Sequence, residues 1–248
     1  GDVEKLYYGD LLNYGLSADF IKHELKVAQF GDSISKVSLI QKMVSAFIDP
    51  NAVNLQNDYS TYVFLGPPGS GKSTICAKLM LLSGKKNAPK PEILHVTPEK
   101  LFEADRLQFH SKLFNLKHKR ISRLESKLIC ALENHMVEIS WDFQPSFLKF
   151  FEQQGYNYAR VKPLFVLPAD INYETLKQVL KVCPGASSIV LNKADYGRFP
   201  IRNLMLIYKF NCKIISISGD RMVNSPVNLC DTDFLTDFVQ FTLDELNH

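Results

Sequence analysis

The sequence lacks the marks of several protein classes. It has no run of the roughly 18 consecutive apolar residues that a membrane-spanning helix requires. Its first residues, Gly1 to Lys5, do not resemble a secretory signal. The 248 residues carry a formal net charge of only +3, too little for a global field that attracts nucleic acid. We therefore expect a cytoplasmic protein, soluble or peripheral at the inner face of the cell membrane, and we do not expect nucleic acid as a partner.

The cysteines and histidines form no metal-binding pattern. The five cysteines are odd in number, widely spaced and never in a C-x-x-C pair, and the six histidines never fall at a metal-ligand spacing. We therefore expect reduced thiols and no zinc site. With 46% apolar and 22% charged residues, the chain has the composition of a folded globular protein. Its length fits one large domain or a domain with a helical appendage.

Two patterns of hydrophobic spacing divide the chain. Apolar residues up to about Ile48 recur every three to four positions, as on helices, and the stretch from Asp49 to Asp58 is polar and contains proline. Beyond it, short apolar runs alternate with segments of helical period, which is typical of βαβ units. The expected strands are Thr61–Leu65, Glu92–Thr97, Met136–Trp141, Lys162–Leu167, Ser188–Asn192 and Lys213–Ile217. We predict a helical N domain, residues 1–57, and an α/β domain with a doubly wound parallel sheet, residues 58–248, closed by a helix at 231–246.

A phosphate-binding motif follows the first expected strand. Residues 66–73 read G-P-P-G-S-G-K-S, which fits G-x-x-x-x-G-K-[ST], and a run of helical period follows. In this P-loop pattern, backbone N–H groups surround phosphate oxygens, the lysine reaches the β- and γ-phosphates, and the serine hydroxyl can ligate Mg²⁺. The pattern specifies a nucleoside triphosphate but not its base. The predicted binding residues are Gly66, Gly69, Ser70, Gly71, Lys72, Ser73 and Thr74, of which Ser73 is also a Mg²⁺ ligand.

A second motif lies at the end of a later strand, where open α/β sheets bind their ligands. Residues 192–195 read N-K-A-D. In N-K-x-D the aspartate accepts hydrogen bonds from the ring N–H and the exocyclic amine of guanine, a donor pair that adenine does not present. Asp195, together with Asn192 and Lys193, would therefore select GTP over ATP. The alternative is a turn that caps a helix.

With both motifs in this order, the chain resembles the signal-recognition-particle (SRP) class of GTPases, and within it the flagellar branch, FlhF. The helical first 50 residues resemble the N domain of that class, and residues 69–79, G-S-G-K-S-T-I-C-A-K-L, resemble its P-loop followed by T-x-A-K-L. The segment Phe165–Lys177 resembles its strand, small-residue turn and Y-x-x-L-K helix. Ser218 and Gly219 stand where the class has the closing loop beside the guanine. The resemblance implies bound GTP or GDP with Mg²⁺.

Two catalytic elements depart from the pattern of that class. Pro98 and Leu101 stand where the class has the Asp and Arg that serve Mg²⁺, the attacking water and the γ-phosphate. Where it has D-T-A-G-R, this chain reads D-F-Q-P from Asp142, and proline lacks the N–H with which the glycine senses the γ-phosphate. Asp142 is either a catalytic acid that holds Mg²⁺ through water or a plain carboxylate at the end of a strand. Glu99 or Glu103 is a candidate replacement for the absent acid.

The small net charge hides a basic segment. Six lysines and arginines against the single Glu125 give +5 between Lys112 and Lys127. This segment is either the solvated face of a helix or connector, which we favour, or a patch for anionic lipid, RNA or an acidic partner. The aromatic cluster from Trp141 to Phe151 is either core or an exposed surface for a dimer or another partner.

Three functions fit these residues. The first is an SRP-class, FlhF-like GTP-binding protein with slow, absent or partner-dependent hydrolysis, because binding residues are kept and catalytic ones are absent. By resemblance it would act as a nucleotide-dependent switch in placing or assembling a flagellum or another membrane-linked machine, as a homodimer or with an SRP-class GTPase partner. The second is a degenerate pseudo-GTPase that serves as an interaction or scaffold module. The third is an ATP-dependent P-loop enzyme in which N-K-A-D is incidental.

Overall fold

The computed structural model describes residues 4–49, 61–83, 89–104, 106–155, 160–183, 187–193, 199–219 and 228–229. The helix expected at 231–246 and the domain boundary predicted after residue 57 lie outside these residues. Within them, no helix is long and apolar enough to span a membrane.

The main sheet is built from parallel strands with one antiparallel strand at its edge. Its strands are β3 (Thr61–Leu65), β4 (Glu92–Val96), β5 (His118–Ile121), β6 (His135–Ile139), β7 (Val161–Pro168), β8 (Ser188–Asn192), β9 (Lys213–Ile217) and β10 (Asn228–Leu229). The order across the sheet is β10-β9-β8-β7-β3-β6-β4-β5, and only β10 runs antiparallel to its neighbour. Strands added on both sides of β3 are the mark of a doubly wound sheet, which confirms the predicted fold class.

Six of these strands were expected, with ends that agree within two residues. The exception of interest is β5, which falls inside the basic segment. The interpretation of that segment as a helix face or connector is wrong at His118–Ile121, which pairs in parallel with β4 and forms an edge of the sheet. The sequence H-K-R-I has no apolar alternation to reveal it, and lysine and arginine are common on edge strands because they discourage pairing with other chains.

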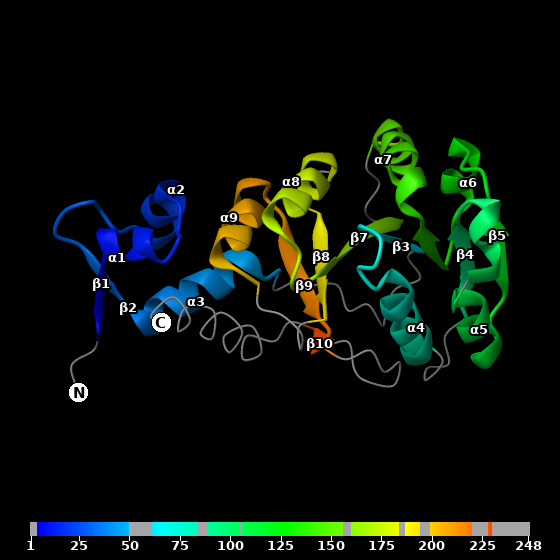
Figure 1. Ribbon diagram of the computed structural model, residues 1–248, viewed down its shortest axis with the longest axis horizontal. Helices are drawn as coiled ribbons and strands as arrows, with labels where there is room; N and C mark the ends of the chain where they lie inside the picture. The colour runs from blue at the N-terminus through cyan, green and yellow to red at the C-terminus, as the bar shows by residue number, and fades with distance from the viewer. Residues whose placement is uncertain are drawn as a thin grey trace.

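Helices cover both faces of the sheet (Figure 1). The alternation of side chains along each strand divides the buried residues into two clusters. The smaller cluster lies under α4 (Lys72–Ser83) and α5 (Arg106–Leu113), which share one face. The larger lies under α6 (Ser126–Ala131), α7 (Gln144–Gln153), α8 (Tyr173–Val182) and α9 (Ile201–Lys209). Two short 3₁₀ helices, η2 (Glu99–Ala104) and η3 (Trp141–Phe143), follow β4 and β6.

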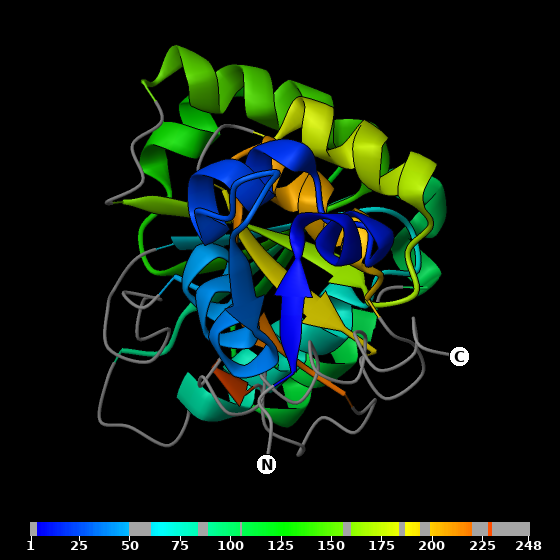
Figure 2. The same cartoon turned by 90° about the vertical axis from the view of Figure 1, so that its left-hand side faces the viewer.

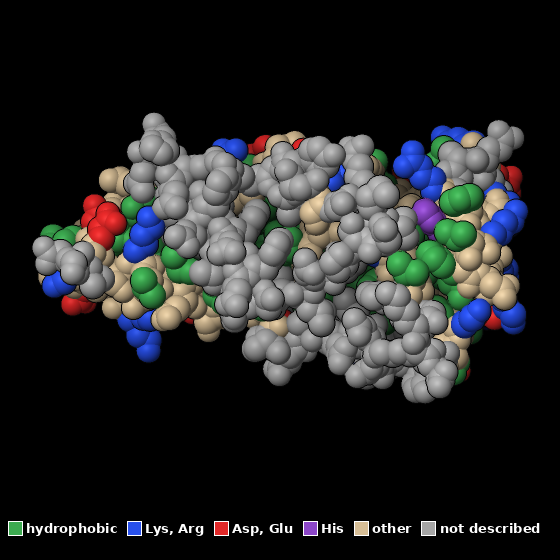
Figure 3. All heavy atoms as spheres, turned by 90° about the horizontal axis from the view of Figure 1, so that it is seen from below, with side chains coloured by type: hydrophobic (Ala, Val, Ile, Leu, Met, Phe, Trp, Pro, Cys, Tyr) green, Lys and Arg blue, Asp and Glu red, His purple; other side chains and the backbone are tan. Residues whose placement is uncertain are grey.

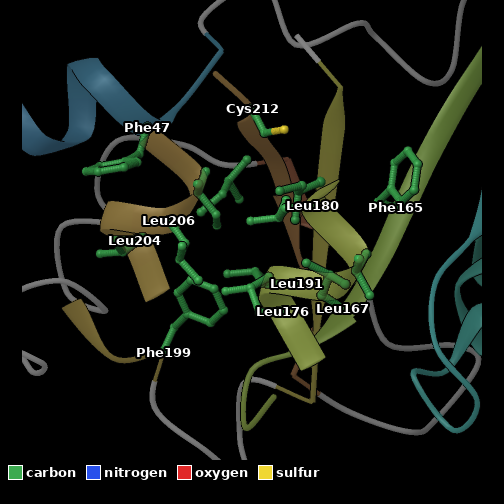
Figure 4. Packing of buried hydrophobic residues seen from close by; sticks show 14 of the residues in the cluster. Phe47, Phe165, Leu167, Leu176, Leu180, Leu191, Phe199, Leu204, Leu206 and Cys212 are labelled. Carbon is green, nitrogen blue, oxygen red and sulfur yellow. The ribbon is translucent and has the colours of Figure 1, made fainter. Parts of the chain in front are cut away.

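The N-terminal elements pack against the end of the sheet that carries α9 (Figure 2). They are β1 (Lys5–Tyr7), α1 (Tyr8–Asn13), α2 (Ala18–Phe20), the π-helix η1 (Ile21–Leu25), β2 (Ser33–Ser35) and α3 (Lys36–Phe47). Phe20 and Phe47 stack at 5.6 Å between ring centroids, and Tyr208 of α9 meets both rings edge-on. Figure 4 shows Phe47 of α3 beside Leu204 and Leu206 of α9. The N-terminal segment therefore shares one apolar core with the sheet.

The N-terminal segment is not purely helical. Strands β1 and β2 pair antiparallel, with Leu6 opposite Ile34, and both of these side chains are buried. Three-residue strands are too short for a period of two to stand out from the helical spacing around them. In the aromatic cluster, Phe147 and Phe151 are buried and stacked at 5.7 Å, whereas Trp141 is 38% exposed. Part of the cluster is therefore core.

Candidate functional site

The P-loop connects the end of β3 at Leu65 to the start of α4 at Lys72. At two of its glycines the backbone has a positive φ and also lies very close to another residue. Gly66 has φ +137°, and a Cβ there would lie 2.1 Å from the carbonyl oxygen of Val166. Gly71 has φ +90°, and a Cβ there would lie 1.9 Å from Nδ2 of Asn192. Only glycine fits at either position.

Lys72 lies inside the curve of the loop. Its Nζ donates hydrogen bonds to the carbonyl oxygens of Gly66 at 3.1 Å and Pro67 at 3.0 Å. Burial lowers the pKa of Lys72, and the nearby carboxylate of Glu138 opposes that shift. The net shift is downward, so the carbonyl acceptors and Glu138 do not fully compensate the buried ammonium, and a further anion beside it would be favourable.

The hydroxyl of Ser73 points at an acid that the sequence analysis did not single out. Ser73 Oγ donates a 2.7 Å hydrogen bond to Oε2 of Glu138, and Nε2 of His95 lies 3.8 Å from Oε1 of the same carboxylate. His95 on β4 and Glu138 on β6 are register partners, so their side chains lie side by side on the face of α4 and α5. A serine hydroxyl and a carboxylate are oxygen ligands of the kind that Mg²⁺ prefers.

A second residue that sequence reasoning missed is Gln144, at the start of α7. Its Nε2 donates to the carbonyl oxygens of Gly66 at 2.8 Å and Ile139 at 3.0 Å, and its Oε1 accepts from Gly66 N–H at 3.1 Å. Gln144 is 4% exposed. The side chain therefore ties the first residue of the P-loop to the end of β6.

Two predicted base-reading residues are bonded to the other end of the P-loop. Nδ2 of Asn192 donates to the carbonyl oxygen of Ser70 at 3.0 Å, and Nζ of Lys193 donates to that of Gly69 at 2.6 Å. Asn192 is the last residue of β8 and is buried. Asp195 lies outside the described residues. The two motifs are thus brought together, as expected of the carboxyl ends of parallel strands in one sheet, although β7 lies between β3 and β8.

The closing loop predicted beside the base follows β9. Ser218 is buried, and its Oγ accepts a 2.6 Å hydrogen bond from Nζ of Lys78 on α4. Gly219 comes next and is the last residue described in that loop. Lys78, one turn or more beyond the P-loop, therefore links the helix that follows the phosphate site to the loop expected at the base.

A cavity of about 680 Å³ lies beside the P-loop. Its wall is made by the P-loop, the end of β8, and the ends of β4 and β6 with α5. It is lined by Gly69, Gly71, Lys72, Ser73, Thr74, His95, Thr97, Leu101, Arg106, His110, Glu138, Ser140, Asn192 and Lys193. Among the described residues that line it, Glu138 is the only acid.

Two of the three acids proposed from the sequence, Asp142 and Glu99, lie elsewhere. Asp142 is exposed in η3, three residues beyond the end of β6, and does not line the cavity. Glu99 is exposed in η2, and its carboxylate accepts a 3.1 Å hydrogen bond from the hydroxyl of Ser122 beyond β5. The carboxylate that the Ser73 hydroxyl contacts is that of Glu138.

These residues fit a nucleotide phosphate with Mg²⁺. The glycines at 66 and 71 let the loop pack closely against Val166 and Asn192, and Oγ of Ser70 is buried without a hydrogen-bond partner in the described part of the chain. Lys72 could supply the cation for such a phosphate, and Ser73 with Glu138 could supply oxygen ligands for the metal. Because Mg²⁺ keeps several waters, two protein ligands are a normal complement.

The sheet order and the P-loop after the central strand define an α/β protein with the fold of the SRP-class P-loop GTPases. Solved structures with this fold include FlhF complexed with GMPPNP and Mg²⁺, at 14% identity and a TM-score of 0.67, and FlhF complexed with GTP and Mg²⁺, at 15% and 0.63; each match covers 94% of this chain and 96% of the other. FtsY of Thermotoga maritima matches at 15% identity and a TM-score of 0.64, covering 95% of this chain and 86% of its own. The resemblance noted in the sequence is confirmed as one of fold. No protein-family model and no curated protein matches the sequence.

Proposed function

We propose that this protein binds GTP and GDP with Mg²⁺. The observation that carries the proposal is a P-loop bonded at its far end to Asn192 and Lys193, with Lys72 and Ser73 beside the carboxylate of Glu138. Phosphate, metal and base would thus be served by one cavity. The two FlhF structures with this fold were solved with GTP or GMPPNP and Mg²⁺, which supports the same ligand class here.

Base selection rests on Asp195, whose carboxylate would accept from both guanine donors while Ser218 and Gly219 provide the neighbouring edge. A site that accepts hydrogen bonds from both donors of a base binds a base without them much more weakly, because the acceptors of the site would be left buried and unpaired. An ATP-dependent enzyme is the competing interpretation, and it predicts that Asp195 is dispensable.

For the metal, Ser73 and Glu138 are the proposed protein ligands. When bound, Mg²⁺ would neutralise part of the negative charge of the phosphates. Asp142 stays a candidate that acts through water, and Glu99 a candidate acid only if η2 moves toward the cavity. Glu138→Gln keeps the hydrogen bond to Ser73 but removes the charge, so it should lower Mg²⁺-dependent affinity with little effect on affinity measured in EDTA.

We propose that hydrolysis is slow, absent or dependent on a partner. Glu138, the one acid among the described lining residues, already accepts from Ser73, and Leu101 contributes an apolar side chain to the wall. Water positioning and charge stabilisation typically supply several orders of magnitude in phosphoryl transfer. A pseudo-GTPase module would differ by failing to bind nucleotide at all.

One titration tests these alternatives. The purified chain is titrated with fluorescent GTP and ATP in Mg²⁺, and phosphate release is followed in the same samples. We expect GTP-selective binding that is abolished in Asp195→Asn and in Lys72→Ala, with little phosphate release. Preference for ATP contradicts the assignment of Asp195 to guanine. If neither nucleotide binds at millimolar concentration, the pseudo-GTPase interaction module is the remaining interpretation. A circular-dichroism melt of Lys72→Ala checks that the variant is folded.

By analogy with the FlhF fold, we further propose a nucleotide-dependent switch in placing or assembling a flagellum or another membrane-linked machine. Such a switch would pair with a second copy or with an SRP-class GTPase when the triphosphate is bound. Light scattering of the chain with GDP and with a non-hydrolysable GTP analogue tests the homodimer. An increase in mass with the analogue alone supports it, and equal masses contradict it.

Peripheral contact with anionic membrane is a separate part of the proposal. The end of the molecule formed by α5 and β5 exposes basic and apolar side chains together (Figure 3). Phe109 is 67% and Leu113 64% exposed, and the exposed basic residues of the segment from 112 to 127 are Lys112, Lys117, Lys119, Arg123 and Lys127. Vesicles with and without phosphatidylserine test this surface. Binding should need the anionic lipid and fall in Lys119→Glu but not in the control Lys149→Glu on α7.

A further inference from the structure

The wall of the cavity that lies away from the base carries three nitrogen-bearing side chains. His95 comes from β4, and Arg106 and His110 come from α5, one turn apart on the same helix face. None belongs to the motifs that the sequence displays. All three are brought to the cavity because His95 points to the sheet face that α4 and α5 cover.

The pair on α5 is arranged as if for an anion. Burial lowers the pKa of His110, and the guanidinium of Arg106 lowers it further, which favours the neutral imidazole. Nδ1 of His110 is buried and has no hydrogen-bond partner within the described ranges. A neutral imidazole keeps one N–H, so an anion that reaches both side chains would accept a hydrogen bond from each.

The position of Arg106 and His110 in the cavity points to the terminal phosphate of a bound polyphosphate. In P-loop proteins the serine hydroxyl is a ligand of the metal at the phosphates. The corresponding hydroxyl here is that of Ser73, which donates to Glu138. Arg106 and His110 line the same cavity on the α5 side of that pair. Leu101, at the position where SRP-class sequences have an arginine, adds only an apolar side chain to this wall.

We propose that Arg106, assisted by His110, binds the terminal phosphate of a nucleoside triphosphate and so sets the preference for tri- over diphosphate. Arg106 on α5 would thereby take the place of the arginine that SRP-class sequences have at the position of Leu101. The proposal rests on the proposed nucleotide site, because the γ-phosphate is placed by the P-loop. Arg106 acts here as a binding residue, and no step of hydrolysis is assigned to it.

Affinity ratios provide the test. Dissociation constants are measured by calorimetry for a non-hydrolysable GTP analogue, GDP, tripolyphosphate and pyrophosphate, in the wild type, Arg106→Gln and Arg106→Lys. Because Arg106→Gln removes one charge-assisted hydrogen bond to the terminal phosphate, affinity for the two triphosphate ligands should fall about tenfold to a hundredfold. Affinities for GDP and pyrophosphate should stay within about twofold, and Arg106→Lys should recover part of the loss.

Two controls separate binding from structure. Lys112→Gln removes an exposed charge from the last turn of the same helix, outside the cavity lining, and should change no affinity. His110→Phe should lower the triphosphate affinities by a smaller factor than Arg106→Gln. Melting temperatures of all variants are compared, and because Arg106 is exposed, its replacement should leave the fold intact.

The outcomes distinguish this inference from the guanine assignment. Equal losses for tri- and diphosphate ligands in Arg106→Gln, or no loss at all, overturn the role of Arg106 while leaving nucleotide binding in place. A wild type that ignores guanine nucleotides yet prefers tripolyphosphate to pyrophosphate, with Arg106→Gln abolishing the preference, overturns the guanine assignment and supports the phosphate subsite. A wild type that binds none of the four ligands overturns both.

Discussion

Gln144→Met gives the sharpest test of how the P-loop is held. The methionine side chain has nearly the length and volume of glutamine and is also a good helix former, so packing at the start of α7 is largely kept. What is removed is the set of three hydrogen bonds between Gln144 and the backbone of Gly66 and Ile139. Because Gln144 is buried, water cannot replace them.

The expected cost follows from these hydrogen bonds. The two bonds that Gln144 donates are worth about 1 kcal/mol each, and the N–H of Gly66, left buried without an acceptor, costs about 1–3 kcal/mol. The carbonyl of Gly66 still accepts from Lys72, so it adds no further penalty. We therefore expect the free energy of unfolding to fall by about 3–5 kcal/mol.

Urea unfolding followed by circular dichroism measures this loss. Gln153→Met is the matched control, because Gln153 is exposed at the other end of α7 and its replacement should change stability by less than about 0.5 kcal/mol. We also expect weaker binding of fluorescent GTP in Gln144→Met, since the first residue of the loop is no longer fixed. A loss below about 1 kcal/mol with unchanged nucleotide affinity would refute the reasoning that the clamp organises the P-loop.

Three further predictions concern the loop, the core and the thiols. Gly71→Ala should lower nucleotide affinity more than tenfold by calorimetry, because its Cβ would lie 1.9 Å from a side-chain nitrogen. Gly69 has open space around it, so Gly69→Ala should lower the free energy of unfolding in urea by only about 1–2 kcal/mol, the strain of the left-handed backbone. Phe47→Ala should destabilise the chain by about 3–5 kcal/mol and leave a single unfolding transition, since its ring belongs to the shared core; two separate transitions would contradict this. Peptide mapping after iodoacetamide at pH 8 should find exposed Cys130 labelled well before Cys212, because burial raises the pKa of Cys212 to about 11 and its labelling rate should climb with pH up to that value.

The elements that sequence predicted well are those whose signal is local. The strands at residues 61–65, 188–192 and 213–217 agree to the residue, because each is a short apolar run bounded by polar or turn-forming positions. The P-loop and the first two residues of N-K-A-D are bonded to each other. Their positions could be predicted because each motif adjoins the end of a strand that the sequence itself reveals. The edge strand β5 and the strands β1 and β2 have no such local pattern and were missed.

The acid beside Ser73 was missed for a different reason. Glu138 is flanked by buried apolar residues inside β6, and no motif draws attention to it. Its role arises from the strand order, which places β6 directly beside β3 although 65 residues separate Glu138 from Ser73 along the chain. The choice of Asp142 followed the motif of a related class, and that motif is altered here. An acidic residue within an otherwise apolar strand was the one available signal.

The hydrogen bonds around the P-loop bear on whether the absence of catalytic residues also means an absence of binding. The loop is held at Gly66 by Gln144 and at its other end by Asn192 and Lys193, all through backbone groups that do not depend on a ligand. A loop held in this way does not have to be ordered by the nucleotide, so little binding free energy is spent on its conformation. The preorganised loop thus favours a nucleotide-binding protein over a scaffold with an idle pocket, and it makes tight binding compatible with slow hydrolysis.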